Sequence, residues 1–186
     1  MSKIILGFVG PIASGKGTAC EYLKNKYNAG TTRFSSILRD IVGRLGIPES
    51  RNDLQKLSLA LRQGFGDDVL AKAIALDVQK DKQPIIGVDG VRRLPDIKYL
   101  REIPGFYLVS IDADQKKRFE RIVGRGENTD DTTKTFENFK KDEKGEAEKN
   151  IQEIQTQAQF HLDNNGTKKE LYGQIDEMLK KLITSI

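Results

Sequence analysis

Residues 10–18 read Gly10-Pro11-Ile12-Ala13-Ser14-Gly15-Lys16-Gly17-Thr18, and this stretch decides which fold the chain can adopt. An apolar run at residues 4–9 precedes it, and a helix-forming run at residues 19–27 follows. The glycines let the backbone N–H groups point inward, and the helix start adds its positive dipole end and unpaired donors. The order of strand, glycine-rich turn, lysine and helix predicts a loop that binds a nucleoside triphosphate, with Lys16 reaching the β and γ phosphates.

The loop departs from the usual phosphate-binding pattern at one position. That pattern places Ser or Thr directly after the lysine, whereas here Gly17 stands between Lys16 and Thr18. The alternative to a phosphate site is a glycine-rich turn that only joins the strand to the helix. The combined strand, spacing, lysine and helix favour the phosphate site. The residues expected to hold the triphosphate are Gly10, Ala13, Ser14, Gly15, Lys16, Gly17 and Thr18.

Size and composition narrow the classes of protein to which the chain can belong. With 186 residues and 20.9 kDa, it fits one domain with insertions. Its net charge of +4 comes from interleaved Lys, Arg, Asp and Glu, which favours small anionic partners over extended nucleic acid. The single cysteine, Cys20, excludes a disulfide framework and predicts a reducing, cytoplasmic setting. A secretion signal or a membrane-spanning run is not expected.

Short apolar runs alternate with longer amphipathic stretches along the chain. The runs at residues 4–9, 31–34, 85–88, 106–111 and 160–162 are predicted as strands, with helices between them. This pattern predicts an α/β fold with a doubly wound, parallel, five-stranded sheet. Two stretches are longer than a simple crossover between parallel strands requires. Residues 35–80 hold three helical patterns, and residues 124–149 are polar, so we expect the second stretch to bury little surface and to cover the active site. A solvated surface helix is the alternative for it.

Phosphoryl transfer between two anions requires several fixed cations at one place. Arginine suits this role because its planar fork binds phosphate oxygens in pairs and stays charged when desolvated. The sequence offers three arginine sites: Arg39 within Ser35-Ser36-Ile37-Leu38-Arg39, the pair Arg92-Arg93, and Arg121 with Arg125, which share a helical face. Each of them also has a plainer interpretation as a solvated or ion-paired surface residue.

Asp89 ends the apolar run at residues 85–88 and precedes Gly90 and the Arg92-Arg93 pair. The carboxyl end of a strand in an open parallel sheet is where ligands bind. Asp89 is therefore predicted to hold Mg²⁺, mostly through water, because this hard cation keeps much of its hydration shell. A turn-forming or helix-capping role is the alternative. The turn Asn164-Asn165-Gly166-Thr167 after the last strand can present backbone groups to a donor base at Gly166.

Taken in order, these motifs resemble nucleoside monophosphate kinases of the adenylate kinase group, with a short lid. The resemblance rests on Gly-Lys-Gly-Thr at 15–18, Ser-Ser-x-x-Arg at 35–39, Asp-Gly at 89–90, Arg-Ile-Val-Gly-Arg at 121–125 and Asn-Gly-Thr at 165–167. It implies a P-loop kinase fold, ATP and Mg²⁺ as cofactors, a lid at about 124–149, and an acceptor-binding insertion at about 35–80.

The resemblance also implies roles for individual residues. Arg39 would grip the acceptor phosphate, with Ser35 or Ser36 near its sugar or base. Either Arg92 or Arg93 would contact phosphate, and Thr18 would approach the metal through water. Arg121 would pack on the donor base, and Arg125 would contact the donor phosphates. Lys140 and Lys141 stand where the family often has arginine. Ile97 occupies the position of the glutamine that reads adenine in adenylate kinases, so a deoxynucleotide, a pyrimidine nucleotide or another phosphorylated acceptor stays open.

Two other functions fit the same loop. A dephospho-coenzyme A kinase shares the fold but phosphorylates a sugar hydroxyl, and Phe34-Ser35-Ser36 lacks the acidic residue that would activate one. A P-loop ATPase that acts as a switch on a protein or RNA partner would leave Arg39 and the Arg92-Arg93 pair without a role. The sequence therefore favours a nucleotide kinase with a small-molecule substrate, and it leaves the oligomeric state undetermined.

Overall fold

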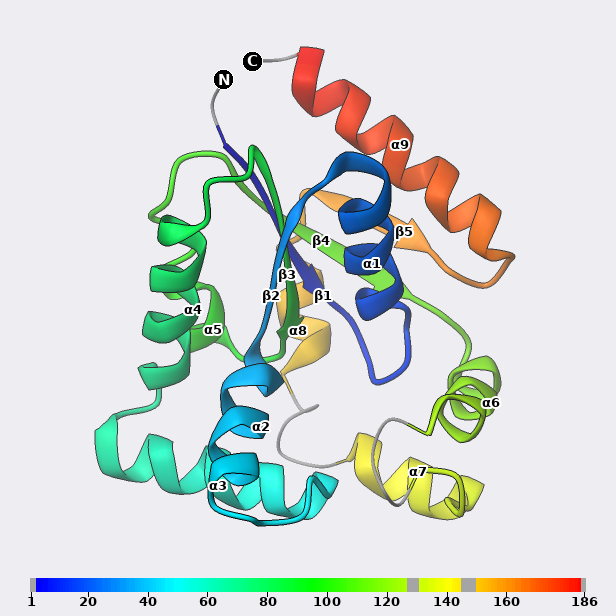
Figure 1. Cartoon of the computed structure of the whole chain (residues 1–186). Coiled ribbons are helices and arrows are strands. Elements are labelled where there is room, and N and C mark those ends of the chain that lie inside the picture. The colour runs from blue at the N-terminus through cyan, green and yellow to red at the C-terminus, as the bar shows by residue number, and fades with distance from the viewer. Residues whose placement is uncertain (1–2, 127–130, 145–149, 185–186) are drawn as a thin grey trace.

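The computed structural model describes residues 3–126, 131–144 and 150–184. Five parallel strands form one sheet: β1 (Ile4–Val9), β2 (Gly30–Arg33), β3 (Ile85–Val91), β4 (Phe106–Asp112) and β5 (Phe160–Asp163). Their spatial order is β2-β3-β1-β4-β5, so β1 lies at the centre of the sheet (Figure 1). The predicted five-stranded parallel α/β fold is confirmed.

The side chains of β1 alternate between two hydrophobic cores, one on each face of the sheet. Ile4, Leu6 and Phe8 pack with α1 (Lys16–Tyr27) and α9 (Lys168–Thr184), and this core also buries Cys20. Ile5 and Val9 point to the other face. Both faces are covered, which explains why the central strands are apolar throughout.

Three helices from the long insertion and the short helix after β3 cover the second face of the sheet. They are α2 (Phe34–Arg44), α3 (Arg51–Phe65), α4 (Val69–Lys80) and α5 (Leu94–Lys98), with α8 (Ile151–Gln155) beside them. Phe34, predicted as the end of a strand, instead begins α2, and its side chain is buried in this core. Figure 1 shows α2 and α3 extending below the carboxyl ends of the strands.

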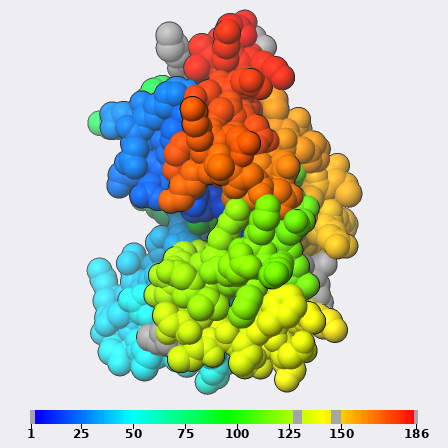
Figure 2. Space-filling model, turned by 90° about the vertical axis from the view of Figure 1, so that its right-hand side faces the viewer, coloured from blue at the N-terminus to red at the C-terminus, as the bar shows by residue number. Residues whose placement is uncertain are grey.

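The two remaining helices, α6 (Gln115–Arg125) and α7 (Phe136–Glu143), stand on the opposite side of those strand ends. Figure 2 shows them below α9 on the side of the molecule that faces the viewer. Phe139 of α7 is fully buried and contacts Phe119 and Phe136 in a third core that contains Ile12 and Ile122. Of residues 131–144, Asp131 and Phe139 are buried and the rest are exposed or partly exposed, which agrees with the expectation that this stretch buries little surface, while Phe139 anchors α7 to α6.

Parts of the predicted lid, residues 127–130 and 145–149, lie outside the described residues. Within the described ranges, the helices are all too short or too polar to cross a membrane.

Candidate active site

Residues 10–18 form a tight turn between the end of β1 and the start of α1. Gly10 cannot be replaced without movement, because an added Cβ would lie 2.1 Å from the carbonyl oxygen of Ile111 and 2.8 Å from Ser14 Oγ. Ala13 and Gly15 adopt left-handed backbone conformations, with φ of 58° and 115°. The turn thus directs its backbone toward the start of α1, where the first N–H groups of a helix have no partner within the helix.

Lys16 lies across this turn and is 6% exposed. Its Nζ donates hydrogen bonds to the carbonyl oxygens of Gly10 and Pro11, at 2.7 and 2.8 Å. The first residues of the loop therefore bind the ammonium group of Lys16 and fix its position beside the loop.

The turn after β5 is bound directly to the phosphate loop. Asn164 is 6% exposed, and its Nδ2 donates to the carbonyl oxygen of Ser14 at 2.6 Å. Arg121 Nη2 in turn donates to the carbonyl oxygen of Asn164 at 2.7 Å, whereas Arg121 Nη1 is buried with no hydrogen-bond partner among the described residues. Burial, and next to it the charge of Arg118, lower the pKa of Arg121. Arg121 is thereby held beside the loop at the position where the sequence predicted a donor-binding side chain.

Asp89 and Arg33 face each other at the carboxyl ends of β3 and β2. They are register partners, and Arg33 Nε lies 3.0 Å from Asp89 Oδ2. Asp89 is 5% exposed, and its Oδ2 lies 3.5 Å from an ideal Cβ on Gly17. The carboxylate therefore stands next to the phosphate loop, as predicted for a magnesium-binding group, but it is ion-paired with an arginine that sequence analysis did not select.

A single cavity of about 890 Å³ joins the phosphate loop to the insertion. Eleven Lys and Arg side chains line it against three carboxylates, Glu21, Asp89 and Asp96. The cations are Lys16, Arg33, Arg39, Arg51, Lys56, Arg62, Arg92, Arg93, Arg121, Arg125 and Lys168. This excess of positive charge in a recess is suited to an anion larger than a single phosphate.

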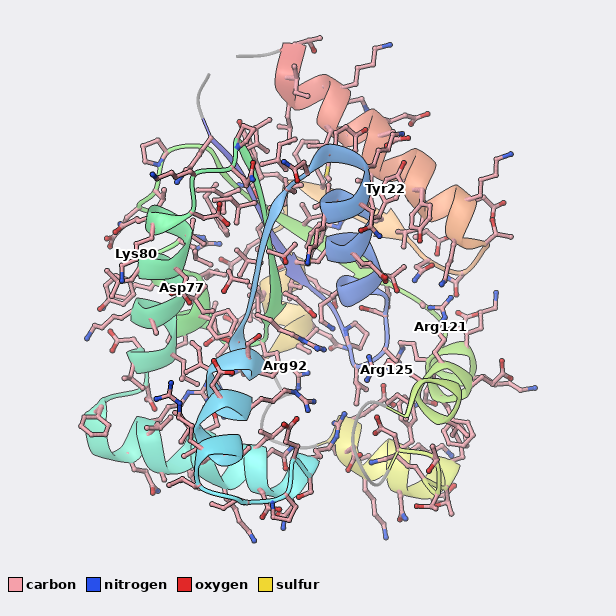
Figure 3. The ribbon with its side chains drawn as sticks, in the orientation of Figure 1. Tyr22, Asp77, Lys80, Arg92, Arg121 and Arg125 are labelled. Carbon is pink, nitrogen blue, oxygen red and sulfur yellow. The ribbon has the colours of Figure 1, made fainter. Side chains whose placement is uncertain are left out.

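Most of the side chains selected from the sequence meet at this cavity. Those that line it are Ala13, Gly15, Lys16, Gly17, Thr18, Ser35, Arg39, Asp89, Arg92, Arg93, Arg121, Arg125 and Gly166. Figure 3 places Arg92 near the start of α2, and Arg121 and Arg125 on the α6 side. Gly10, Ser14 and Ser36 are not among the residues that line the cavity.

Some of the selected side chains also have partners outside the phosphate loop. Arg39 Nη1 donates to Glu49 Oε2 at 2.6 Å. Arg39 therefore forms the ion pair of the plainer interpretation and also lines the cavity. Arg125 Nη2 lies 3.9 Å from Asp131 Oδ2. Lys140 pairs with Glu137 of its own helix, and neither Lys140 nor Lys141 lines the cavity.

The side chains that α3 contributes to the cavity were not predicted from the sequence. Arg51, Gln55, Ser58 and Arg62 recur at intervals of three and four residues and therefore share one helical face, and all four line the cavity. This spacing could have been recognised in the sequence. Asp96 was also not predicted, and no sequence pattern indicates it, because its burial depends on how α5 packs against the insertion.

A pair of adjacent acids at the end of α7 connects both sides of the cavity. Glu143 accepts a hydrogen bond from Arg118 Nη1. Arg118 Nη1 also donates to the carbonyl oxygen of Ile12 in the phosphate loop, at 3.3 Å. Asp142 Oδ2 accepts from Lys134 at 2.6 Å and lies 3.9 Å from Arg51 Nε of α3. One short helix thus touches the phosphate loop through Arg118 and the acceptor insertion through Arg51.

The donor atoms around the loop fit a nucleotide-bound Mg²⁺ better than a metal held by protein alone. Magnesium bound with a nucleotide typically takes one or two carboxylates, water and phosphate oxygens. Asp89 and Thr18 line the cavity beside Lys16, whereas the described residues contain no cluster of three or more His, Cys, Asp or Glu side chains that could hold a metal alone.

Comparisons with known proteins agree with this fold. A family model described as an AAA domain matches residues 9–140. A UPF0200 protein of Methanocaldococcus jannaschii is 25% identical, over 98% of this chain and 92% of its own length. Another UPF0200 protein, from Hyperthermus butylicus, is 29% identical over 80% of this chain and 79% of its own.

Solved structures share the architecture at low sequence identity. Shikimate kinase from Bacteroides thetaiotaomicron has a TM-score of 0.64 and 12% identity, covering 96% of this chain and 98% of that one. Shikimate kinase from Acinetobacter baumannii, in complex with shikimate, has a TM-score of 0.58 and 10% identity, covering 98% and 94%. At this identity the likeness supports the fold alone.

Proposed function

Because the chain belongs to the AAA domain family, we propose that it is a P-loop kinase that transfers the γ-phosphoryl group of ATP to a nucleoside monophosphate or a similar small phosphorylated acceptor. The observation that carries the proposal is the shared cavity. It joins the phosphate loop to an arginine-lined recess formed by the insertion, so two anionic ligands can meet in one space.

The donor half of the cavity is formed by the phosphate loop, α6 and the turn after β5. Lys16 and the N-terminus of α1 would bind the β and γ phosphates, and Asp89 with Thr18 would hold Mg²⁺ through water. The bound Mg²⁺ would neutralise charge on the donor phosphates. Arg121, fixed by the carbonyl oxygen of Asn164, would flank the donor base, with Gly166 beside it, and Arg125 would reach the donor phosphates.

The acceptor half is formed by α2, α3, α4 and the β3–α5 turn. Its cations include Arg39, Arg92 and Arg93, while Leu38, Leu54 and Leu70 supply apolar surface for a flat ring. Both arginines of the pair line the cavity, so we assign both to phosphate binding. Ser35 lies at the start of α2 beside them, whereas Ser36, which does not line the cavity, is not assigned a contact.

The carboxylates of the acceptor half favour an acceptor that is already an anion. A hydroxyl acceptor needs a base within hydrogen-bond reach. Asp89 is paired with Arg33, and Asp96 Oδ2 accepts two backbone N–H groups. A phosphate oxygen needs no such base. Because Asp89 and one oxygen of Asp96 are already engaged, we favour a phosphate acceptor over the sugar hydroxyl of a dephospho-coenzyme A kinase, which would need Glu21 or the other oxygen of Asp96 as its base.

Rate enhancement would come from alignment and charge compensation. The transferred group spreads negative charge over its oxygens, and Lys16 with the converging arginines would stabilise that charge in a space from which water is excluded. α7 contacts Arg51 of the acceptor half and, through Arg118 of α6, Ile12 of the phosphate loop, and it would act as the cover. This chemistry requires no covalent intermediate on the enzyme.

The proposal is tested by incubating the protein with ATP, Mg²⁺ and each of the common nucleoside and deoxynucleoside monophosphates, in parallel with dephospho-coenzyme A, and resolving the products. We expect a nucleoside diphosphate from at least one monophosphate, together with ADP in equal amount. The Lys16→Ala protein serves as the matched control. ADP formed at the same rate with and without every acceptor would instead indicate an ATPase and overturn the proposal.

A further inference from the structure

We infer that Asp96 is a positioning residue that fixes the arginines of the acceptor half, and that acceptor binding depends on its negative charge. This inference rests on the proposed function and deepens it by naming the group that organises the acceptor site. Asp96 lies in α5, immediately after the turn that carries Arg92 and Arg93, and it lines the cavity.

One oxygen of Asp96 fixes the backbone of the arginine pair. Oδ2 accepts hydrogen bonds from the backbone N–H groups of Arg92, at 3.0 Å, and Arg93, at 2.9 Å. Hydrogen bonds to a charged acceptor are the stronger kind, and two of them on consecutive residues define the direction of the chain there. The carboxylate therefore sets where the two arginine side chains leave the turn.

The other oxygen of Asp96 faces a third arginine. Oδ1 lies 3.7 Å from Arg62 Nη2 of α3, a distance that suits an ion pair but is too long for a hydrogen bond. Oδ1 has no hydrogen-bond partner among the described residues. Arg62 Nη1 donates to Ser58 Oγ at 2.7 Å, one turn back on the face of α3 that lines the cavity. Asp96 thus connects the β3–α5 turn to α3 across the acceptor half.

The burial of Asp96 exceeds what a helix cap requires. The residue is 2% exposed, and burial raises the pKa of its carboxyl group, with the neighbouring N–H groups and arginines acting in the opposite direction. A hydrogen bond to these backbone N–H groups needs only an oxygen atom, whereas burying a full negative charge is costly unless cations lie beside it. The buried carboxylate instead offsets the positive charges of Arg62 and Arg93, and it holds the backbone of Arg92 and Arg93 in place beside them.

The test is the Asp96→Asn protein, which keeps an oxygen for the backbone N–H groups and removes the charge. We expect the KM for the acceptor monophosphate to rise about 10- to 100-fold, with the KM for ATP changed less than about twofold, because the arginines it holds lie in the acceptor half. Asp68→Asn is the matched control, since Asp68 contacts α5 through Tyr99 and Lys98 but does not line this cavity.

A double-mutant cycle with Arg62→Gln separates positioning from a general loss of structure. If Asp96 acts through Arg62, the Asp96→Asn change has a smaller effect on the acceptor KM in the Arg62→Gln background than in the wild type. Equal effects in both backgrounds, or parallel increases in both KM values, would overturn the inference while leaving the kinase function in place. Absence of transfer by the wild-type protein to every monophosphate would instead remove the proposed function, and this inference with it.

Discussion

Arg33, the last residue of β2, is the register partner of Asp89 in β3, and Arg33 Nε lies 3.0 Å from the carboxylate oxygen of Asp89. The Asp89 carboxylate, which stands next to the phosphate loop, is therefore shared with a cation. A metal ion held by Asp89, as proposed above, would compete with Arg33 for the same oxygen, and the ion pair would then set how readily the site takes up magnesium.

Removing that competition is expected to lower the magnesium requirement. In Arg33→Gln the Asp89 carboxylate loses its partner, and a partly exposed ion pair contributes about 1 kcal/mol, which corresponds to about fivefold in an equilibrium constant. Titration of phosphoryl transfer with Mg²⁺ at saturating ATP measures the half-saturating concentration, which we expect to fall by about that factor. In Asp89→Asn it should rise. A rise in both variants would show that Arg33 does not compete for the metal site.

Lys16→Ala is expected to reduce transfer about 10³-fold or more, because a fixed charge on the developing phosphate is lost. The fold should persist, since hydrogen bonds such as those from Lys16 to the carbonyl oxygens of Gly10 and Pro11 each contribute only about 1 kcal/mol to stability. Steady-state rates and thermal unfolding measure the two effects. Lys24→Ala, an exposed position on the same helix, is the control and should retain wild-type turnover. Near-normal turnover in Lys16→Ala would place the site elsewhere.

Gly10→Ala should destabilise the protein by about 2 kcal/mol or more, since its Cβ would overlap the carbonyl oxygen of Ile111 and force the backbone to move. Gly43→Ala is the matched control. It lies inside α2 with no atom within 4 Å of an added Cβ, and it should stabilise by about 0.5–1 kcal/mol. Denaturant unfolding distinguishes the two, and equal effects on the free energy of unfolding would contradict the loop geometry.

Phe139→Ala should detach α7 from α6. The side chain is fully buried against Phe119 and Phe136, so its removal costs about 3 kcal/mol of local packing. Hydrogen exchange should increase across residues 136–143 while the central strands keep their protection. If α7 covers the cavity, ATP hydrolysis in the absence of acceptor should also rise. Unchanged exchange in α7 would contradict the anchoring role of Phe139.

Asp68 should make stability depend on pH at the acidic end. The Tyr99 hydroxyl, followed by Lys72, lowers the pKa of Asp68 to about 2. A carboxyl group with a depressed pKa stabilises the folded state above its unfolded pKa of about 3.9, and this stabilisation is lost as the pH falls toward its folded pKa. The melting temperature of Asp68→Asn should therefore lie below that of wild type at about pH 5 and approach it below about pH 3. A constant difference would show that the ion cluster does not titrate as expected.

Much of the site followed from residues that are local in the chain. The phosphate loop, the strand-end Asp89 and the arginines at 39, 92, 93, 121 and 125 could be selected because each follows a strand or shares a helical turn, and parallel strands bring their carboxyl ends to one edge. The expectation that residues 124–149 bury little surface holds for most of residues 131–144, but it did not include the anchor of α7. Phe139 is buried against Phe119 of another helix, and a contact between two helices leaves no pattern within a short stretch of sequence.

The sequence by itself determined the order of the strands and helices, the phosphate loop and the positive character of the site, because these depend on backbone preferences and hydrophobic period within short stretches. Only the tertiary structure decided that Arg33 pairs with Asp89, that α3 turns Arg51 and Arg62 into the cavity, and that Asp96 is buried between Arg62 and the backbone N–H groups of Arg92 and Arg93. The reason is physical. The electrostatic energy of a charged group depends on the charges around it and on its exposure to water. Folding sets both, because it brings together residues that are far apart in the chain.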